Sequence, residues 1–199
     1  MFTVSPFVST TAILAINYVK RAINKEVNGM SVEEHKKHIT AIKCMVITVS
    51  DTRSEETDKS GNLIVKLLEQ AGHQVNFKEI VKDDSTKIKT VVTTGCENPE
   101  VEAIITNGGT GISYRDVTIE SVKKLIEKEM PGFGEIFRVL SYKEDIGSAA
   151  ILSRAIAGVR NHTAIFSTPG STGAVKLAMN KLILPELSHV VSEIKKDII

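Results

Sequence analysis

The chain has no tryptophan, only two cysteines and only five prolines among its 199 residues. Cys44 and Cys96 are too few for a disulfide framework or a cysteine metal cluster, and they are typical of the reduced thiols of a cytosolic protein. Aromatic residues make up 5% of the sequence, which leaves little surface for stacking single-stranded nucleic acid. The formal net charge is +1, so overall charge does not favour nucleic-acid or membrane binding. We therefore expect a cytoplasmic protein that binds neither nucleic acid nor membranes.

The sequence also lacks a long uninterrupted apolar run. Residues 2–19 are moderately apolar, but polar residues and Pro6 interrupt them, which makes a transmembrane span a poor interpretation. A secretory signal carries positive charge before its apolar core, whereas the first basic residues here, Lys20 and Arg21, follow the apolar stretch.

Composition divides the chain into a short leading part and one domain. Residues 1–29 are either a loosely attached N-terminal extension or a mis-called gene start, and we favour the second interpretation because the residues from Met30 look like an ordinary polar N-terminus. We expect a polar segment over 30–42 and a single domain over 43–197. Hydrophobic residues at 42% and charged residues at 25% are ordinary for a globular domain.

Apolar runs and helical periodicity alternate along this domain. Short β-branched runs predict strands at 44–49, 75–80, 101–105, 155–160 and 163–167, the last two turning at Asn161-His162. Helical spacing predicts helices from Asp58 to Gly72, from Asp84 or Ser85 to Asn98, from Thr118, from Pro131, and from 172 to 194 with a break at Pro185. This order is typical of a parallel sheet with right-handed crossovers. We predict an α/β fold, a mostly parallel, doubly wound three-layer αβα sandwich with a short antiparallel edge.

The most informative stretch is a glycine loop, Asn107-Gly108-Gly109-Thr110-Gly111, placed between a buried strand and a helix. Three glycines in four positions allow a ligand to approach the backbone closely. A strand followed by such a loop and a helix N-terminus presents N–H groups to anions such as phosphate. The small residues of 167–173 form a second strand-to-helix loop suited to an anion. A glycine loop by itself is more often an ordinary turn.

Carboxylates gather at the same predicted edge of the sheet. Asp51, Asp83, Asp84 and Asp116 all follow predicted strands, whose carboxyl ends meet in a parallel sheet. Carboxylates next to phosphates favour a bridging Mg²⁺, which prefers oxygen ligands. The pattern predicts phosphoryl or nucleotidyl transfer, with Asp83 and Asp116 flanking the glycine loop. For Asp51 and Asp84 a helix cap or a solvated charge is an equally good interpretation. Arg154 could pair either with a phosphate or with a carboxylate in a structural salt bridge.

Together these motifs resemble the MoaB/Mog family of molybdenum cofactor biosynthesis. The resemblance covers about residues 40 to 195 and follows the family order: Ser50-Asp51, Asp58-Lys59-Ser60-Gly61, Lys82-Asp83-Asp84, Gly108-Gly109-Thr110-Gly111, Arg115-Asp116-Val117-Thr118, 129–135, 150–155 and Ser167-Thr168-Pro169-Gly170-Ser171. Two positions depart from the family pattern. Lys82 stands where proline is frequent and Asn107 where threonine is usual, which affects fine positioning rather than the class of chemistry.

The resemblance implies an adenylyltransferase that moves AMP from Mg-ATP to the terminal phosphate of molybdopterin and releases pyrophosphate. It assigns catalysis, with Mg²⁺ at the triphosphate, to Asp83 and Asp116. It assigns molybdopterin and its phosphate to Gly108, Gly109, Thr110, Gly111, Ser153, Pro169, Gly170 and Ser171, and the nucleotide to Ser50, Asp51, Asp58, Ser60 and Gly61. The alternative is a carrier that binds molybdopterin without adenylylating it. A homotrimer or hexamer is typical of the family, contact with other molybdenum cofactor enzymes is a further expectation, and the choice between molybdenum and tungsten stays open.

Overall fold

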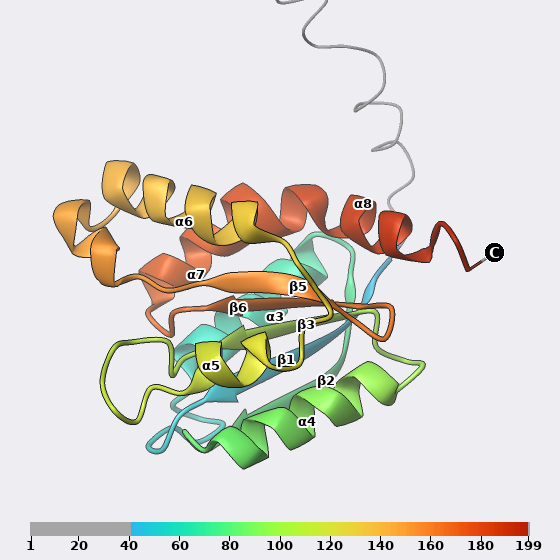
Figure 1. Cartoon of the computed structure of the whole chain (residues 1–199), viewed down its shortest axis with the longest axis horizontal. Coiled ribbons are helices and arrows are strands. Elements are labelled where there is room, and N and C mark those ends of the chain that lie inside the picture. The colour runs from blue at the N-terminus through green and yellow to red at the C-terminus, as the bar shows by residue number, and fades with distance from the viewer. Residues whose placement is uncertain (1–40, 199) are drawn as a thin grey trace, which may run out of the picture. The chain divides into compact units, whose positions relative to one another are not determined.

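A computed structural model describes residues 41–198, so the predictions for 1–29 and for most of 30–42 lie outside the described residues. The described part contains a six-stranded sheet of order β2-β1-β3-β6-β5-β4 with helices on both faces (Figure 1). Strands β2, β1, β3 and β6 run parallel, whereas β5 and β4 form an antiparallel edge. The predicted three-layer αβα fold is confirmed. Within residues 41–198 no helix combines the length and apolar character needed to cross a membrane.

Each predicted strand and helix is present, with one strand two residues later than the predicted 101–105, and one short strand and one 3₁₀ helix had no predicted range. The strands are β1 (Lys43–Val49), β2 (Gln74–Val81), β3 (Ala103–Asn107), β4 (Lys128–Glu129), β5 (Ile156–Arg160) and β6 (Thr163–Thr168). The helices are α3 (Lys59–Gln70), α4 (Ser85–Glu97), α5 (Thr118–Lys123), α6 (Pro131–Glu144), α7 (Thr172–Ala178) and α8 (Leu184–Lys195), with a 3₁₀ helix η1 (Gly147–Leu152) and a π-helix η2 (Met179–Ile183). Asn161 and His162 have positive φ, as a two-residue hairpin turn between β5 and β6 requires.

Successive residues of the central strands face opposite layers of helices. In β1, Val46 packs in the core with α3, α6, α7 and α8, whereas Ile47 packs with α4 and α5. In β3, Ile105 and Ile104 divide in the same way. Because helices cover both faces, apolar residues follow one another in the middle of these strands rather than alternating with polar ones. The same packing encloses Cys44 and Cys96, which are buried and unpaired.

Two aspartates fix the helix ends nearest the carboxyl edge of the sheet. The Asp58 carboxylate accepts a hydrogen bond of 2.9 Å from the backbone N–H of Gly61 and caps α3. Asp84, rather than Ser85, caps α4 by accepting a 2.9 Å hydrogen bond from the Lys87 N–H. For Asp84 the structure therefore shows the helix-cap role.

The prediction that Pro185 breaks the last helix is wrong. Helical backbone continues from α7 through η2 into α8, where Pro185 occupies the first turn. Proline has no backbone N–H, and it lies just after the π-helix, where the helical hydrogen-bond pattern changes. The π-helix makes the junction, since the Leu184 N–H bonds to the carbonyl of Met179, five residues earlier.

Candidate functional site

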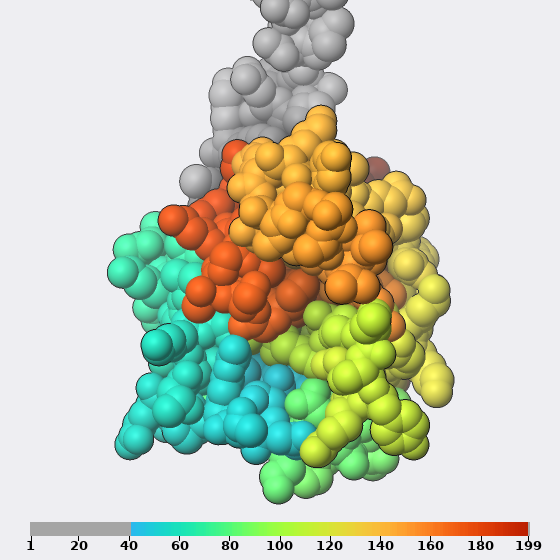
Figure 2. All heavy atoms as spheres, turned by 90° about the vertical axis from the view of Figure 1, so that its left-hand side faces the viewer, coloured from blue at the N-terminus to red at the C-terminus, as the bar shows by residue number. Residues whose placement is uncertain are grey.

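The loops that follow β1, β2, β3 and β6 meet at the carboxyl end of the sheet, on the side that faces the viewer in Figure 2. They surround an open cavity of about 560 Å³. Its lining contains Val49, Ser50, Thr52, Arg53, Asp83, Gly108, Gly109, Thr110, Gly111, Asp116, Ile146, Ala149, Leu152, Ser153, Pro169, Gly170 and Ser171. The convergence of these loops, expected from the strand order, is confirmed. Ligands of doubly wound folds bind in this position.

The glycine loop is pressed against the end of β1. Gly108 has φ +99°, and a Cβ there would lie 2.2 Å from the carbonyl oxygen of Val49. Only glycine fits this close approach. No hydrogen bond within residues 41–198 uses the backbone N–H groups of Gly109 and Thr110. These two donors at the cavity wall are available to an anionic ligand.

Arg154 holds the glycine loop from behind. Its Nε donates to the Thr110 carbonyl at 2.9 Å and its Nη2 to the Gly111 carbonyl at 2.5 Å. The same guanidinium forms an ion pair with Glu120 on α5. Of the two interpretations that the sequence allowed for Arg154, the structure shows the structural ion pair, and adds a clamp on the loop.

Asp83 points an unsatisfied oxygen at this loop. Its Oδ1 is buried and has no hydrogen-bond partner within the described part of the chain. Burial raises the pKa of Asp83, the nearby carboxylates of Asp51 and Asp116 raise it further, and the Arg115 cation opposes the rise. A buried carboxylate oxygen with no donor, among other negative groups, fits a cation.

Asp116 lies on the other side of the loop and is well satisfied. It accepts hydrogen bonds from the N–H and hydroxyl of Ser113, at 3.0 and 2.5 Å. These bonds hold the pKa of Asp116 below its usual value, so it is ionised at neutral pH. Its Oδ2 lies 2.6 Å from where a Cβ on Gly111 would be. The structure therefore places both predicted carboxylates beside the glycine loop, in opposite electrostatic environments.

These two carboxylates are compatible with Mg²⁺ bound mainly through substrate oxygens. Within residues 41–198 no group of three or more His, Cys, Asp or Glu side chains is arranged to hold a metal. Mg²⁺ commonly takes one or two carboxylates and completes its octahedron with waters and phosphate oxygens. Asp83, with its free oxygen, and Asp116, which is ionised, match that donor set.

The residues predicted to contact the nucleotide fall into two groups. Ser50 lines the cavity, while Asp51 pairs with Arg115 at 2.5 Å and is absent from the lining. Asp58, Ser60 and Gly61 are buried and do not line the cavity. Direct nucleotide contact by these residues stays a prediction.

Beneath the cavity, Asp58 is the centre of a polar network that sequence reasoning missed. Its carboxylate accepts from the Thr48 hydroxyl at 2.8 Å and lies 3.5 Å from Arg53 and 3.4 Å from Lys78. Arg53 is one of 25 lysine and arginine residues in the chain, and in the sequence only its position two residues after Asp51 hints at a role.

Asn107, one of the two departures from the family pattern, belongs to this network. Its Oδ1 accepts from the Ser60 hydroxyl at 2.6 Å, and its Nδ2 donates to the Thr48 hydroxyl at 2.9 Å. The amide therefore joins the end of β3 to the end of β1. A threonine offers a single hydroxyl and cannot supply both contacts in the same way.

On the remaining wall, Ser153, Pro169, Gly170 and Ser171 all line the cavity. The Ser171 hydroxyl also accepts a 3.2 Å hydrogen bond from the Ala174 N–H and caps α7. Ile146 and Leu152, which sequence reasoning did not single out, add exposed apolar surface at this rim. This wall combines small polar groups with apolar surface.

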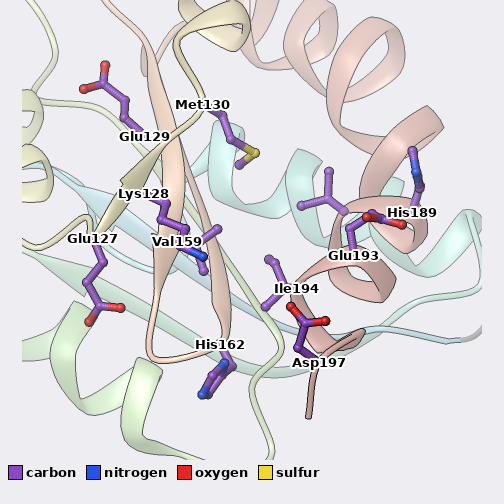
Figure 3. Close-up of a pocket in the computed structure, with 11 residues that line it drawn as sticks. Glu127, Lys128, Glu129, Met130, Val159, His162, His189, Glu193, Ile194 and Asp197 are labelled. Carbon is purple, nitrogen blue, oxygen red and sulfur yellow. The ribbon is translucent and has the colours of Figure 1, made fainter. Parts of the chain in front are cut away.

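A second cavity, of about 420 Å³, lies between β4 and α8 (Figure 3). Its acidic side chains come from both walls, with Glu127 and Glu129 at β4 opposite Glu193 and Asp197 at the end of the chain. His162 also lines this cavity and lies in the turn that precedes β6. The cavity is therefore at the end of β6 opposite to the glycine loop. It contains no glycine loop, so we assign the candidate site to the carboxyl edge.

Comparison with known proteins identifies a family and several relatives. The model of a family described as "Probable molybdopterin binding domain" matches residues 45–189. Molybdenum cofactor biosynthesis protein B of Bacillus subtilis (strain 168) is 63% identical over 169 residues, covering 84% of this chain and 99% of that protein. The protein of the same name from Staphylococcus carnosus (strain TM300) is 55% identical over 157 residues, covering 78% and 92%.

Solved structures show the same architecture. A crystal structure of molybdenum cofactor biosynthesis protein B is 55% identical with a TM-score of 0.79, covering 80% of this chain and 99% of that one. The tungsten cofactor synthesizing protein MoaB from Pyrococcus furiosus is 37% identical with a TM-score of 0.70, covering 78% and 98%.

Proposed function

The chain belongs to the molybdopterin-binding domain family, and we propose that it acts in molybdenum cofactor biosynthesis by transferring AMP from Mg-ATP to the terminal phosphate of molybdopterin. The names of the relatives support the biosynthetic role. The transfer reaction is the finer part of the proposal and rests on the site. The observation that carries it is the buried, unpartnered Oδ1 of Asp83 beside the glycine loop.

The glycine loop is suited to the phosphate of molybdopterin. The unengaged N–H groups of Gly109 and Thr110 can donate to phosphate oxygens, and the Arg154 clamp keeps the loop rigid from behind. Donors held in place before the ligand arrives cost little reorganisation when charge develops. The loop would therefore both bind the phosphate and orient it for attack.

Asp83 and Asp116 are the residues that would hold Mg²⁺ against the nucleotide phosphates. When bound, the ion would neutralise charge on the triphosphate and on the departing pyrophosphate. A carrier needs no cation at this point, because a molybdopterin phosphate alone is better bound without nearby carboxylates. This contrast supports the enzyme over the carrier.

The reaction requires no nucleophilic side chain. An oxygen of the molybdopterin phosphate would form the new bond to the α-phosphorus of ATP, while the bond between that phosphorus and the oxygen bridging to the β-phosphorus breaks. Pyrophosphate leaves with the electron pair of that bond. The contribution of the protein is to position two anions and offset their charge, which is how phosphoryl transfer is generally catalysed.

The test is pterin-dependent AMP transfer by the purified protein with molybdopterin, Mg-ATP and inorganic pyrophosphatase. Asp83→Asn and Asp116→Asn should each lower the rate by about 100-fold or more, because each removes a charge at the transfer site. Asp84→Asn is the matched control, since it removes the neighbouring carboxylate, retains a good helix cap and does not line the cavity.

Turnover that survives in Asp84→Asn and is lost in the other two variants would support the proposal. Tight molybdopterin binding by the wild type without turnover would establish the carrier instead. We also propose a homotrimer or hexamer, which light scattering on the purified chain would test.

A further inference from the structure

Arg53 joins two loops of the site through one guanidinium group. Its Nη2 donates to the Gly170 carbonyl at 2.9 Å, and its Nη1 donates to the Ser60 hydroxyl. Gly170 in turn lies against the glycine loop, because a Cβ on Gly170 would be 3.0 Å from the Cα of Gly108. The guanidinium therefore lies where the loops after β1, β3 and β6 come together.

Part of this guanidinium has no hydrogen-bond partner. Arginine has five N–H donors. Within residues 41–198 the Nε–H of Arg53 has no hydrogen-bond partner, and Nη2 makes one bond with its two N–H groups, so two donors remain for a fork. Its side chain is 29% exposed, and Arg53 lines the cavity. The bonds to Ser60 and Gly170 hold the group in one orientation, so the two free donors keep fixed directions.

The local charge is also unbalanced. The buried Asp58 carboxylate lies between two cations, Arg53 at 3.5 Å and Lys78 at 3.4 Å. Asp58 and Lys78 do not line the cavity, so Arg53 is the member of this group that offers its charge to a ligand there. The carboxylates of Asp83 and Asp116 lie against Gly109 and Gly111 of the glycine loop, whereas Arg53 bonds to Gly170. The lining of the cavity thus carries one guanidinium, that of Arg53, and two carboxylates, those of Asp83 and Asp116.

We propose that Arg53 binds a phosphate oxyanion of the substrate at the junction of the two loops. The arrangement fits a phosphate because the guanidinium fork matches adjacent phosphate oxygens. The oxyanion belongs either to the molybdopterin monoester or to the nucleotide triphosphate. The identity of the phosphate rests on the proposed function, whereas anion binding by Arg53 does not.

The test is calorimetric titration of the full chain with two probes, phenyl phosphate as a monoester and ATP with Mg²⁺. Arg53→Gln should weaken binding of at least one probe by about tenfold or more, the usual effect of losing a hydrogen bond to a charged group. The probe that is weakened identifies the source of the oxyanion. Arg53→Lys keeps the charge but loses the fork, and should weaken the same probe by a smaller factor.

Lys78→Gln is the matched control. It removes the other cation next to Asp58 but does not line the cavity, so it should bind both probes as the wild type does. Wild-type affinity for both probes in Arg53→Gln would overturn the proposal. An equal loss of affinity in Lys78→Gln would also overturn it. So would a wild-type protein that binds neither phenyl phosphate nor ATP with Mg²⁺. Failure of AMP transfer with phosphate binding still dependent on Arg53 would overturn only the proposed function.

Discussion

Asp83 Oδ1 and Thr118 Oγ1 each lie 2.4 Å from the position that a Cβ on Gly109 would occupy. Both oxygens are buried and without hydrogen-bond partners among the described residues. Gly109 is therefore the point at which the turn after β2, the glycine loop and the start of α5 come together. The space around its Cα is already filled by polar atoms.

Gly109→Ala should damage the site more than the fold. Its φ of +60° strains any residue with a Cβ, and the added methyl would displace the Asp83 carboxylate, so we expect a loss of roughly 1–3 kcal/mol in the free energy of unfolding. AMP transfer should fall by at least about tenfold at temperatures where the variant remains folded. Denaturant unfolding and the transfer assay measure the two effects.

Gly132→Ala is the matched control for this variant, because a Cβ there meets nothing within 4 Å and Gly132 lies in the first turn of α6. It should leave activity and stability close to those of the wild type. A fully active Gly109→Ala protein would show that the position of Asp83 is not critical.

Asp83 should make the protein less stable as the pH rises. Because burial raises the pKa of Asp83 above its unfolded value, the folded state binds more protons than the unfolded state between the two values. Stability is therefore lost as the pH rises through this window. Asp83→Asn cannot ionise, and it should be more stable than the wild type above the folded-state pKa while being inactive. Urea unfolding at a series of pH values checks this.

Asp116 should affect the pH dependence of stability in the opposite direction, which Asp116→Asn tests. Hydrogen bonds from Ser113 lower the pKa of Asp116. Its contribution to the free energy of unfolding is therefore present above the unfolded-state pKa and is lost as the pH falls through the folded-state pKa. If the Asp83→Asn and wild-type stabilities differ by the same amount at every pH, the assignment of a raised pKa to Asp83 is wrong.

Arg154→Lys should loosen the glycine loop without unfolding the domain. One ammonium cannot reproduce the two bonds from Nε and Nη2 to the Thr110 and Gly111 carbonyls, so we expect phosphate affinity to fall by about fivefold or more. Arg160→Lys is the control, because Arg160 also donates to a backbone carbonyl, that of Leu125, but lies outside the cavity lining. Equal effects of the two substitutions on phosphate titrations would contradict the clamp role.

The two thiols should be unreactive in the folded protein. Burial raises the pKa of Cys44 to about 12 and that of Cys96 to about 11. At pH 8 the thiolate, which is the reactive form, is then only about one part in 10,000 for Cys44 and one in 1,000 for Cys96. A disulfide reagent should therefore label neither cysteine until denaturant unfolds the chain, when both should react. Rapid labelling without denaturant would show that these strands and helices open readily.

The sequence predicted the sheet and the placement of the glycine loop because both depend on local patterns. Strands covered on two faces, such as β1 and β3, contain continuous apolar runs. Asp83 and Asp116 lie in the segments that follow β2 and β3. A parallel arrangement of these strands therefore predicts both residues at the same edge of the sheet.

What the sequence could not predict depends on contacts between distant residues. Arg53 bonds to Gly170, 117 positions away, and Arg154 bonds to Thr110, 44 positions away. The burial of Asp58 beneath the cavity likewise depends on Thr48 and Lys78, which no local pattern connects with it. The continuous helix through Pro185 was missed because a π-helical junction has no distinctive composition.

The π-helix η2 also sets the rotational phase of α8. Each residue of an α-helix turns the chain by about 100°, and a π turn takes up one residue more than an α turn. Leu187 and Val191 reach the core of the domain only with that extra residue in place. A single-residue deletion within 179–183 that restored α geometry would rotate this apolar stripe by about 100°, toward solvent. The end of the chain is therefore sensitive to the number of residues in η2 as well as to their identity.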